Sequence, residues 1–410
     1  MTASADVDIA IAGGGLTALT AAAVLARAGP EWRIALLADD SHAGAASRSD
    51  AFPEVWTMAL SASSREVFAA LGLWPAIAAR SAAITDIQVS ERGGWGLARL
   101  GPAPGDAPFG QVIENAELVR LLAAAVAACP NVGRASGRNA TPAPRRDHLE
   151  VQSGAGLLRA RLLLVADGTD SPLRAGFGIG VAARDYGNAA LIATLTLAEP
   201  HRGIAYERFT PDGPMALLPL PDRDGQSRAS LVWVLPPERA AALAVAPEPE
   251  RRAELQTAFG RRAGVILGMS TPQLIPLRRC LAHEQVRSRL VLVGNAAHSL
   301  HPVAGQGFNL TVRDLAALAQ CLRADTRTDP GDLGVLAGYA RARERDQWRT
   351  LQFSERLPAL FASRAPLLAL GRNLGLTALG LCPPLRRALA DFGAGLAVPA
   401  ARVVGDESGL

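Results

Sequence analysis

The N-terminal part of the chain alternates apolar runs with small-residue turns, a pattern that predicts a strand–helix–strand unit. Asp8–Ala12 is an apolar run of strand length, and the alanine-rich run Thr17–Ala28 favours a helix. Gly29 and Pro30 follow, as expected where a helix ends. Arg33–Leu37 then returns to a strand pattern, so we expect two neighbouring parallel strands joined by the helix.

The central part of the chain is dominated by short apolar runs that predict strands. Ile84–Leu100 has strand character around a Gly93-Gly94 turn, and Pro211-Asp212-Gly213 marks another turn. The other predicted strands are Leu149–Gln152, Leu157–Ala166, Ala190–Leu197, Ile204–Phe209, Met215–Leu220 and Ala229–Leu235. These runs predict a mixed or antiparallel sheet inserted between two parts of the first unit.

Helical segments accompany these strands at Glu117–Ala128 and Glu248–Arg262. We expect the chain to return to the cofactor-binding part near Pro276, and helices dominate after Leu333. We therefore expect an α/β fold with a Rossmann-like cofactor-binding domain, an inserted mixed β-sheet domain and a helical C-terminal region. The expected boundaries are 1–80, 100–180 and 270–335 for the cofactor-binding domain, 81–99 and 181–269 for the sheet domain that would bind substrate, and 336–410 for the C-terminal region.

Composition and charge exclude several functions. The 410 residues carry a formal net charge of +4, and no cluster of basic and aromatic residues suggests nucleic-acid binding. The four cysteines lie far apart, without metal-ligand or redox spacing, and are Cys129, Cys280, Cys321 and Cys382. The chain has no signal-peptide pattern and no long uncharged apolar run, so we expect a cytoplasmic protein without a transmembrane helix.

Gly13, Gly15 and Ala18 fit the G-x-G-x-x-A pattern at the turn between the first strand and its helix. The first glycine permits a tight turn, the second lets the backbone approach a pyrophosphate, and the small third residue allows close packing. Asp39 follows the second strand, where an acid would hold a ribose hydroxyl. Its neighbour Asp40 leaves a second interpretation open, a pair of solvated acids at a strand end.

A second motif, Gly294–Leu310, reads GNAAHSLHPVAGQGFNL and lies between the apolar run Leu290–Val293 and a helical pattern that reaches Leu322. A strand, a tight small-residue turn and a helix start form a place where backbone amides can meet a ligand. If that ligand is a flavin ring, the positive helix N-terminus favours its anionic reduced form. The alternative is an ordinary strand–loop–helix corner.

A third candidate lies midway, where the apolar strand Leu162–Val165 is followed by Ala166, Asp167 and Gly168. An acid and a glycine after a buried strand could position a nucleotide, but the same dipeptide is common in routine turns, and taken alone it favours that interpretation. No residue of the chain stands out as catalytic, and no spacing indicates a metal site.

Together the three motifs have the order and spacing of the flavoprotein aromatic hydroxylases, which the chain resembles over nearly its whole length. Within that family it is most similar to the ubiquinone-biosynthesis hydroxylases, which act on polyprenylated phenols. Asn295 also fits this group, because many members of the wider family carry Asp there. The segments that carry the closer match are ALSASSREVFAALGLW (59–74), ITDIQVSERGGWG (84–96), VIEN (112–115), YERFTPDGPMALLPLP (206–221) and RNLGL (372–376).

The resemblance implies an FAD-dependent monooxygenase that uses NAD(P)H and O2, in which a C4a-hydroperoxide would hydroxylate the ring of a polyprenylated phenol. It also implies contact with a membrane surface and with other quinone-biosynthesis proteins. The residues matched to the cofactor are Gly13, Gly15, Ala18 and Asp39 for the ADP half, Asp167 and Gly168 for the pyrophosphate or nicotinamide path, Asn295 for the ribityl–phosphate region, Asn115 for a contact to the flavin, and Pro302, Gly305, Gly307, Phe308 and Asn309 for the isoalloxazine.

Two positions depart from the family pattern. Ala38 stands where an acid usually ends the second strand, and Asp39 follows one residue later. Trp56 stands where relatives typically carry an arginine near the flavin. The absence of this arginine raises the question whether flavin movement or coupling to NAD(P)H is altered. Arg48, which is nearby in the sequence, could take the place of the missing arginine.

Two histidines of the late motif, His298 and His301, invite an acid–base role. His298 matches a position that is usually small or polar in the family, so we expect it to be structural. For His301, which lies closer to the predicted flavin turn, we also favour a hydrogen-bonded structural role over catalysis.

The C-terminal segment Leu357–Leu381 is apolar but interrupted by Arg364 and Arg372. Such a helix could lie on a bilayer, here the inner membrane, and admit a lipid tail, or it could close the core of the fold. Three functions stay open: hydroxylation of a polyprenylated phenol, a flavin monooxygenase or reductase for another small aromatic or isoprenoid, and a non-catalytic flavoprotein scaffold in quinone biosynthesis.

Overall fold

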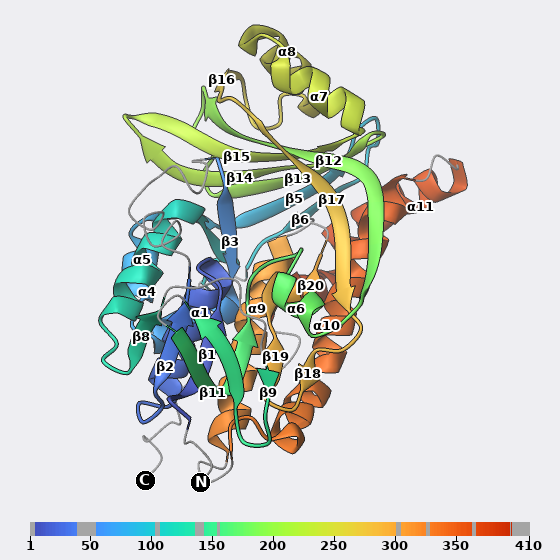
Figure 1. Cartoon of the computed structure of the whole chain (residues 1–410). Helices are drawn as coiled ribbons and strands as arrows, with labels where there is room; N and C mark the ends of the chain where they lie inside the picture. Colours follow the sequence, from blue (N-terminus) through green and yellow to red (C-terminus); the bar gives the residue numbers. More distant parts are fainter. Residues whose placement is uncertain are drawn as a thin grey trace.

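Two large β-sheets dominate the fold, one mostly parallel and one mostly antiparallel (Figure 1). The structure is a computed structural model that describes residues 5–38, 55–102, 107–135, 143–153, 156–300, 305–324, 329–362, 366–393 and 395. In Figure 1 the second sheet crosses the upper part of the molecule, with α7 and α8 above it and the parallel sheet below.

The parallel sheet is built around β1. Within the described residues it has eight strands, in the order β18-β19-β11-β1-β2-β8, with β10 and β9 continuing from β11. β1 pairs in parallel with β2 and β11, and β11 with β19, so the carboxyl ends of these strands meet along one edge. The strands are β1 (Val7–Ala12), β2 (Ile34–Leu37), β8 (Val132–Ala135), β9 (Ala143–Pro144), β10 (Leu149–Ser153), β11 (Gly156–Val165), β18 (Val286–Arg287) and β19 (Leu290–Leu292).

Both faces of the parallel sheet are buried, because its strands are apolar at successive positions. Ile9 and Ile11 of β1 face a core that is shared with helices α1, α5 and α9. Ala10 and Ala12 face the opposite core, which includes residues of β10 and α6. The helices are α1 (Leu16–Ala28), α5 (Asn115–Ala127), α6 (Pro172–Gly176) and α9 (Gln306–Arg323).

The second sheet has nine strands within the described residues, in the order β20-β17-β12-β15-β14-β13-β5-β6, with β16 beside β12. One face packs on α7 and α8 through side chains such as Leu191, Leu217 and Trp233, so alternate positions of the same strands point inward. The elements are β5 (Asp86–Glu91), β6 (Leu97–Leu100), β12 (Val181–Leu197), β13 (Ile204–Thr210), β14 (Gly213–Arg223), β15 (Gln226–Leu235), β16 (Ile266–Met269), β17 (Gln273–Ala282), β20 (His298–Ser299), α7 (Pro237–Val245) and α8 (Glu248–Phe259).

A three-stranded sheet, in the order β3-β7-β4 within the described residues, connects the two large sheets. Its strands β4 and β7 contact β14, while β3 contacts α9. The C-terminal helices run from α9 back to the second sheet, because α10 contacts both α9 and β13. The remaining elements are β3 (Thr57–Ser61), β4 (Ser81–Ile84), β7 (Gly110–Glu114), α3 (Ala62–Ala70), α4 (Trp74–Ala78), η2 (Gly294–Ala296), α10 (Leu333–Ala362), α11 (Pro366–Leu381) and α12 (Pro383–Gly393).

The expected fold class is confirmed: a parallel sheet with helices, a mixed second sheet and a helical C-terminal region are all present. One detail differs, because we expected the chain to return to the cofactor-binding part near Pro276. β17 instead pairs with β12 from Gln273 to Ala282, and β18, which rejoins the parallel sheet, begins at Val286. The domain boundaries themselves stay a prediction.

A buried network of charges joins α9 to α10 and to β20. Asp314 is 0% exposed and accepts hydrogen bonds from Arg343 Nε at 2.6 Å and from His298 Nε2 at 2.8 Å. Arg313 Nε donates to Asp346 Oδ2 at 2.9 Å, and Arg343 also binds Asp346. His298 therefore occupies the hydrogen-bonded structural position that we expected for it.

Burial works to raise the pKa of Asp314, but the hydrogen bond from His298 and the charge of Arg343 outweigh it and hold the pKa below the usual value. The ionised form is thus the one that the folded state stabilises. This stabilisation is present at neutral pH and is lost as the pH falls through the lowered pKa.

We expect Asp314→Asn to lower the free energy of unfolding by about 3–5 kcal/mol, because it leaves Arg343 buried without its full partner. The measurement is urea denaturation at neutral pH and at acidic pH, where the gap between variant and wild type should shrink. Asp86→Asn, in the exposed pair with Arg99, is the matched control and should cost about 1 kcal/mol or less. Equal losses in the two variants would contradict a special role for the buried network.

Candidate functional site

A cavity of about 1650 Å³ joins the carboxyl edge of the parallel sheet to the inner face of the second sheet. Ala18 lies behind it, fully buried, and Asp39 and Pro302, like Arg48 and His301, lie outside the described residues. Most of the predicted cofactor residues line this single cavity, namely Gly13, Gly15, Asn115, Asp167, Gly168, Asn295, Gly305, Gly307, Phe308 and Asn309.

The glycines after β1 bring the backbone to the cavity surface. Gly13 has a φ of +135°, and a Cβ there would lie 2.5 Å from the carbonyl oxygen of Ala166, so only glycine fits. Gly15 precedes α1 without a side-chain cap, and the first N–H groups of that helix face no capping oxygen. Uncapped N–H groups at a helix start that lines a cavity are suited to an anionic group such as a pyrophosphate.

Two buried side-chain oxygens at the cavity lack hydrogen-bond partners among the described residues. Oδ1 of Asn115, at the start of α5, has none, although the residue is only 3% exposed. Oδ1 of Asp167 also has none, while its Oδ2 accepts a hydrogen bond from the backbone N–H of Leu173 at 3.2 Å. Buried polar atoms are normally satisfied, so this pair indicates a place for a polar ligand.

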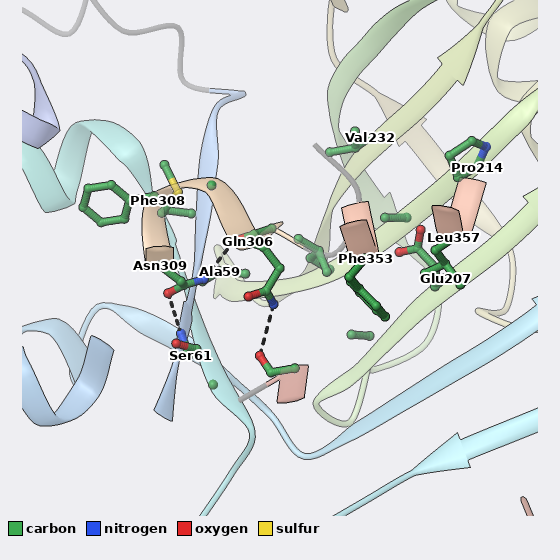
Figure 2. A pocket seen from close by; sticks show the side chains of 18 of the residues that line it. Ala59, Ser61, Glu207, Pro214, Val232, Gln306, Phe308, Asn309, Phe353 and Leu357 are labelled. Atoms are coloured by element: carbon green, nitrogen blue, oxygen red, sulfur yellow. Dashed lines mark hydrogen bonds between the residues drawn. The ribbon is translucent and has the colours of Figure 1, made fainter. Parts of the chain in front are cut away.

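The N-terminus of α9 forms another side of the cavity. Gly305 has a φ of +60° and precedes the helix without a side-chain cap, and Gly307 and Phe308 of the first turn line the cavity. The Asn309 side chain is occupied by the protein itself: Oδ1 accepts from the backbone N–H of Ser61 at 2.9 Å, and Nδ2 donates to the carbonyl of Ala59 at 2.8 Å (Figure 2). Asn309 thus holds β3 against the helix start.

Arg174 joins two loops at the cavity edge. Its Nη1 donates to the carbonyl of Ala296 and its Nη2 to the carbonyl of Thr169, both at 2.9 Å. The first bond fixes the turn beside Asn295, which is exposed and lines the cavity. The second fixes the loop that carries Asp167, so a buried guanidinium sets the spacing of two predicted cofactor contacts.

These features fit an FAD molecule. The uncapped starts of α1 and α9 provide N–H groups, the Gly13 turn provides close backbone approach, and the free oxygens of Asn115 and Asp167 provide acceptors. The positive end of the α9 dipole lies at the position expected for the flavin ring.

Trp56, the residue that departs from the family pattern, also lines the cavity. Its indole Nε1 donates to Oε1 of Gln273 on β17 at 2.9 Å, and its carbonyl accepts from the backbone N–H of Asn115 at 2.8 Å. Trp56 therefore links the three-stranded sheet to the second sheet beside a predicted flavin contact.

The side of the cavity that the second sheet forms is apolar except for one carboxyl. Residues such as Val89, Ala216 and Val232 line it, and Glu207 on β13 lies among them. Burial raises the pKa of Glu207 to about 8. No motif in the sequence marks Glu207, although strand alternation with Phe209 places the acid on the apolar face.

Helices α10, α11 and α12 close the remaining side of the cavity. Phe361 of α10 stacks on Phe209 of β13 with ring centroids 3.7 Å apart, and Leu376 of α11 joins this cluster. α11 is tied to the β5–β6 hairpin, because Asn373 Oδ1 accepts from the N–H of Gly96 at 2.7 Å. This face of α11 closes the core, which is one of the two interpretations left open.

The other face of α11 is exposed and rich in leucine. No helix of the described residues is both long and apolar enough to span a bilayer. The exposed leucines are Leu367 (84%), Leu370 (50%), Leu374 (53%) and Leu381 (78%). The second interpretation, a helix that lies on a membrane surface, is thus compatible with the same element.

Comparisons with known proteins identify the family. A family model described as an FAD binding domain matches residues 6–354. The chain is 34% identical to the ubiquinone hydroxylase UbiL of Rhodospirillum rubrum, over 94% of this chain and 90% of that protein. It is 32% identical to the 3-demethoxyubiquinol 3-hydroxylase of Escherichia coli, over 95% of this chain and 98% of that protein.

Solved structures show the same fold. The p-nitrophenol 4-monooxygenase PnpA of Pseudomonas putida DLL-E4 superposes with a TM-score of 0.75 at 20% identity, over 96% of this chain and 99% of that one. The family resemblance drawn from the sequence is confirmed. The chain belongs to the FAD-binding family of flavoprotein aromatic hydroxylases, in the group that contains the hydroxylases of ubiquinone biosynthesis.

Proposed function

We propose that this protein hydroxylates the aromatic ring of a polyprenylated phenol in ubiquinone biosynthesis, with FAD as cofactor, NAD(P)H as electron donor and O2 as co-substrate. The observation that carries the proposal is the continuity of the cavity, which joins the glycine-lined helix starts to an apolar chamber. The names of the relatives support the substrate class, since one is a ubiquinone hydroxylase and the other a 3-demethoxyubiquinol 3-hydroxylase.

In this proposal the parallel sheet and its helices hold FAD, and the second sheet binds the aromatic ring. Bound FAD supplies the redox chemistry that activates O2. Gly13 lets the backbone approach the diphosphate, the uncapped start of α1 after Gly15 offers N–H groups, Asn115 and Asp167 offer their free oxygens, and the start of α9 faces the flavin.

The chain itself excludes water and orients the ring. The apolar lining of the second sheet and the stacked pair Phe209 and Phe361 give the ring a dry environment, which limits wasteful reactions of activated oxygen with solvent. Leu368 and Leu385 line the cavity and are also about half exposed, so the chamber reaches the surface between α11 and α12. We propose that the prenyl tail leaves the chamber there and that the exposed leucines of α11 rest on a membrane.

The first prediction concerns FAD affinity. Asn115→Ala should weaken FAD binding about tenfold, because one buried hydrogen bond of about 1.4 kcal/mol is lost. The measurement is titration of the flavin-free protein with FAD. Asn131→Ala is the control: its amide bonds the carbonyl groups of Ala26, Gly29 and Trp32, so this change should lower stability and leave FAD affinity intact. Equal FAD affinity in wild type and Asn115→Ala would contradict the assigned contact.

The second prediction tests the reaction. Purified protein loaded with FAD should oxidise NAD(P)H faster when a 2-prenylated phenol is added, and mass spectrometry should detect a product heavier by one oxygen atom. In the host, deletion of the gene should accumulate a quinone precursor that lacks one hydroxyl group. A flavin-loaded protein without phenol-stimulated turnover, together with unchanged quinone content in the deletion strain, would refute the proposal.

The third prediction tests the membrane contact. A Leu367→Glu, Leu374→Glu double variant should bind more than tenfold more weakly to vesicles of phosphatidylglycerol and phosphatidylethanolamine, as measured by co-sedimentation. Each leucine that is buried in the membrane contributes about 1.5 kcal/mol or more to the free energy of binding. Val245→Glu, an 86% exposed position on α7, is the control and should behave as wild type. Unchanged sedimentation of the double variant would remove α11 as the contact surface.

A further inference from the structure

Glu207 is placed by strand geometry on the inner face of the second sheet. Along β13, Ala205, Glu207 and Phe209 point into the cavity, while Tyr206 points away and packs edge-on against Phe259 of α8. The register places Glu207 between Val89 of β5 and Ala216 of β14, both apolar cavity residues. Figure 2 shows Glu207 beside Leu357 of α10.

The carboxyl of Glu207 has no hydrogen bond or salt bridge to any described residue. Its pKa is raised to about 8 by desolvation, and no cation in the described part of the chain lowers it. Of the acids on the packed strand β5, Glu91 binds Arg372 of α11 and Asp86 binds Arg99. Besides Glu207, the charged groups that line the cavity are Arg349 and Arg356 on α10, Arg372 on α11 and Asp167 at the opposite end.

A lone carboxyl in an apolar chamber is costly unless a ligand satisfies it. On the proposed function, which this inference deepens, the substrate presents a ring hydroxyl to an otherwise apolar chamber. We propose that Glu207 is the residue that hydrogen-bonds this ring hydroxyl and thereby selects phenols and orients their rings. The rest of the ring contacts apolar side chains, so this bond fixes its rotation within the chamber.

The proposal fixes the sign of a pH effect. A phenol can pair with either form of the carboxyl, because its hydroxyl both donates and accepts. A methyl ether only accepts, so it pairs with the protonated form alone. Deprotonation of Glu207 near pH 8 therefore weakens the binding of the ether. The binding of the phenol is retained, because the pKa of the phenol itself is about 10. Selectivity for phenol over ether should rise with pH.

The test uses 2-(3-methylbut-2-enyl)phenol and its methyl ether as probes. Their dissociation constants are measured by equilibrium dialysis on the FAD-loaded protein without NAD(P)H, at about pH 6.5 and about pH 9, below the ionisation of the phenol. The variants are Glu207→Gln, which cannot titrate, and Glu207→Leu, which cannot hydrogen-bond. Glu238→Gln, at an exposed acid of α7, is the matched control, and thermal unfolding verifies that each variant folds.

For wild type and Glu238→Gln we expect the ratio of phenol to ether affinity to rise about tenfold between the two pH values. In Glu207→Gln the ratio should not change with pH, and in Glu207→Leu the preference for phenol should disappear. A rise that persists in Glu207→Gln, or a wild type that does not discriminate, would overturn the role of Glu207.

The outcome is separable from that of the proposed function. If the protein hydroxylates the prenylated phenol but fails the dialysis test, the proposed function stands and the role of Glu207 is refuted. If the phenol preference depends on Glu207 but the protein never hydroxylates a phenol, the proposed binding site stands and the proposed reaction is refuted.

Discussion

The side-chain amide of Asn309 connects two segments that the cavity needs and that lie far apart in the chain. It bonds the backbone of Ala59, Ser61 and Gly305 and the hydroxyl of Ser64, at distances of 2.7–2.9 Å. Each of these buried groups, if left without a hydrogen bond, would lower the free energy of unfolding by about 1–3 kcal/mol. The pairing of β3 with the start of α9 is therefore strongly favoured. A carboxylate of the same shape would keep the bonds from Ser61 and Ser64, but it would face the carbonyl oxygens of Ala59 and Gly305 without a donor.

Much of the cofactor end could be predicted from the sequence, because its signals are local. The turn at Gly13 needs a backbone that only glycine adopts, and such positions are visible one residue at a time. The signal of Asp167-Gly168 is weaker by itself, but the order of the three motifs predicts that this dipeptide belongs to the same site. Two features are not visible in any local pattern. The side chain of Asn309 bonds the protein's own backbone, and Arg174 sets the distance between two loops.

The substrate end was less accessible to prediction, because it depends on pairing between distant segments. Glu207 becomes exceptional only when β13 lies between β5 and β14 and when α10 covers that face. The position of β17 was misjudged for a similar reason: its composition suits either sheet, and only its register with β12 decides. For α11, the sequence left two interpretations open: one face of the helix closes the core, and contact of the exposed face with a membrane stays a proposal.

The pairing of β12 with β17 has a mechanical consequence. Figure 1 shows both strands rising from the level of the parallel sheet to the second sheet, and their ladder runs from Val181↔Ala282 to Ile192↔Gln273 with one irregularity between Asp185 and Ala189. A paired ribbon of this kind resists bending much more than a flexible linker does, and a rotation of one sheet away from the other would break its hydrogen bonds. The ribbon therefore holds the two sheets, and with them the two ends of the cavity, at a fixed separation.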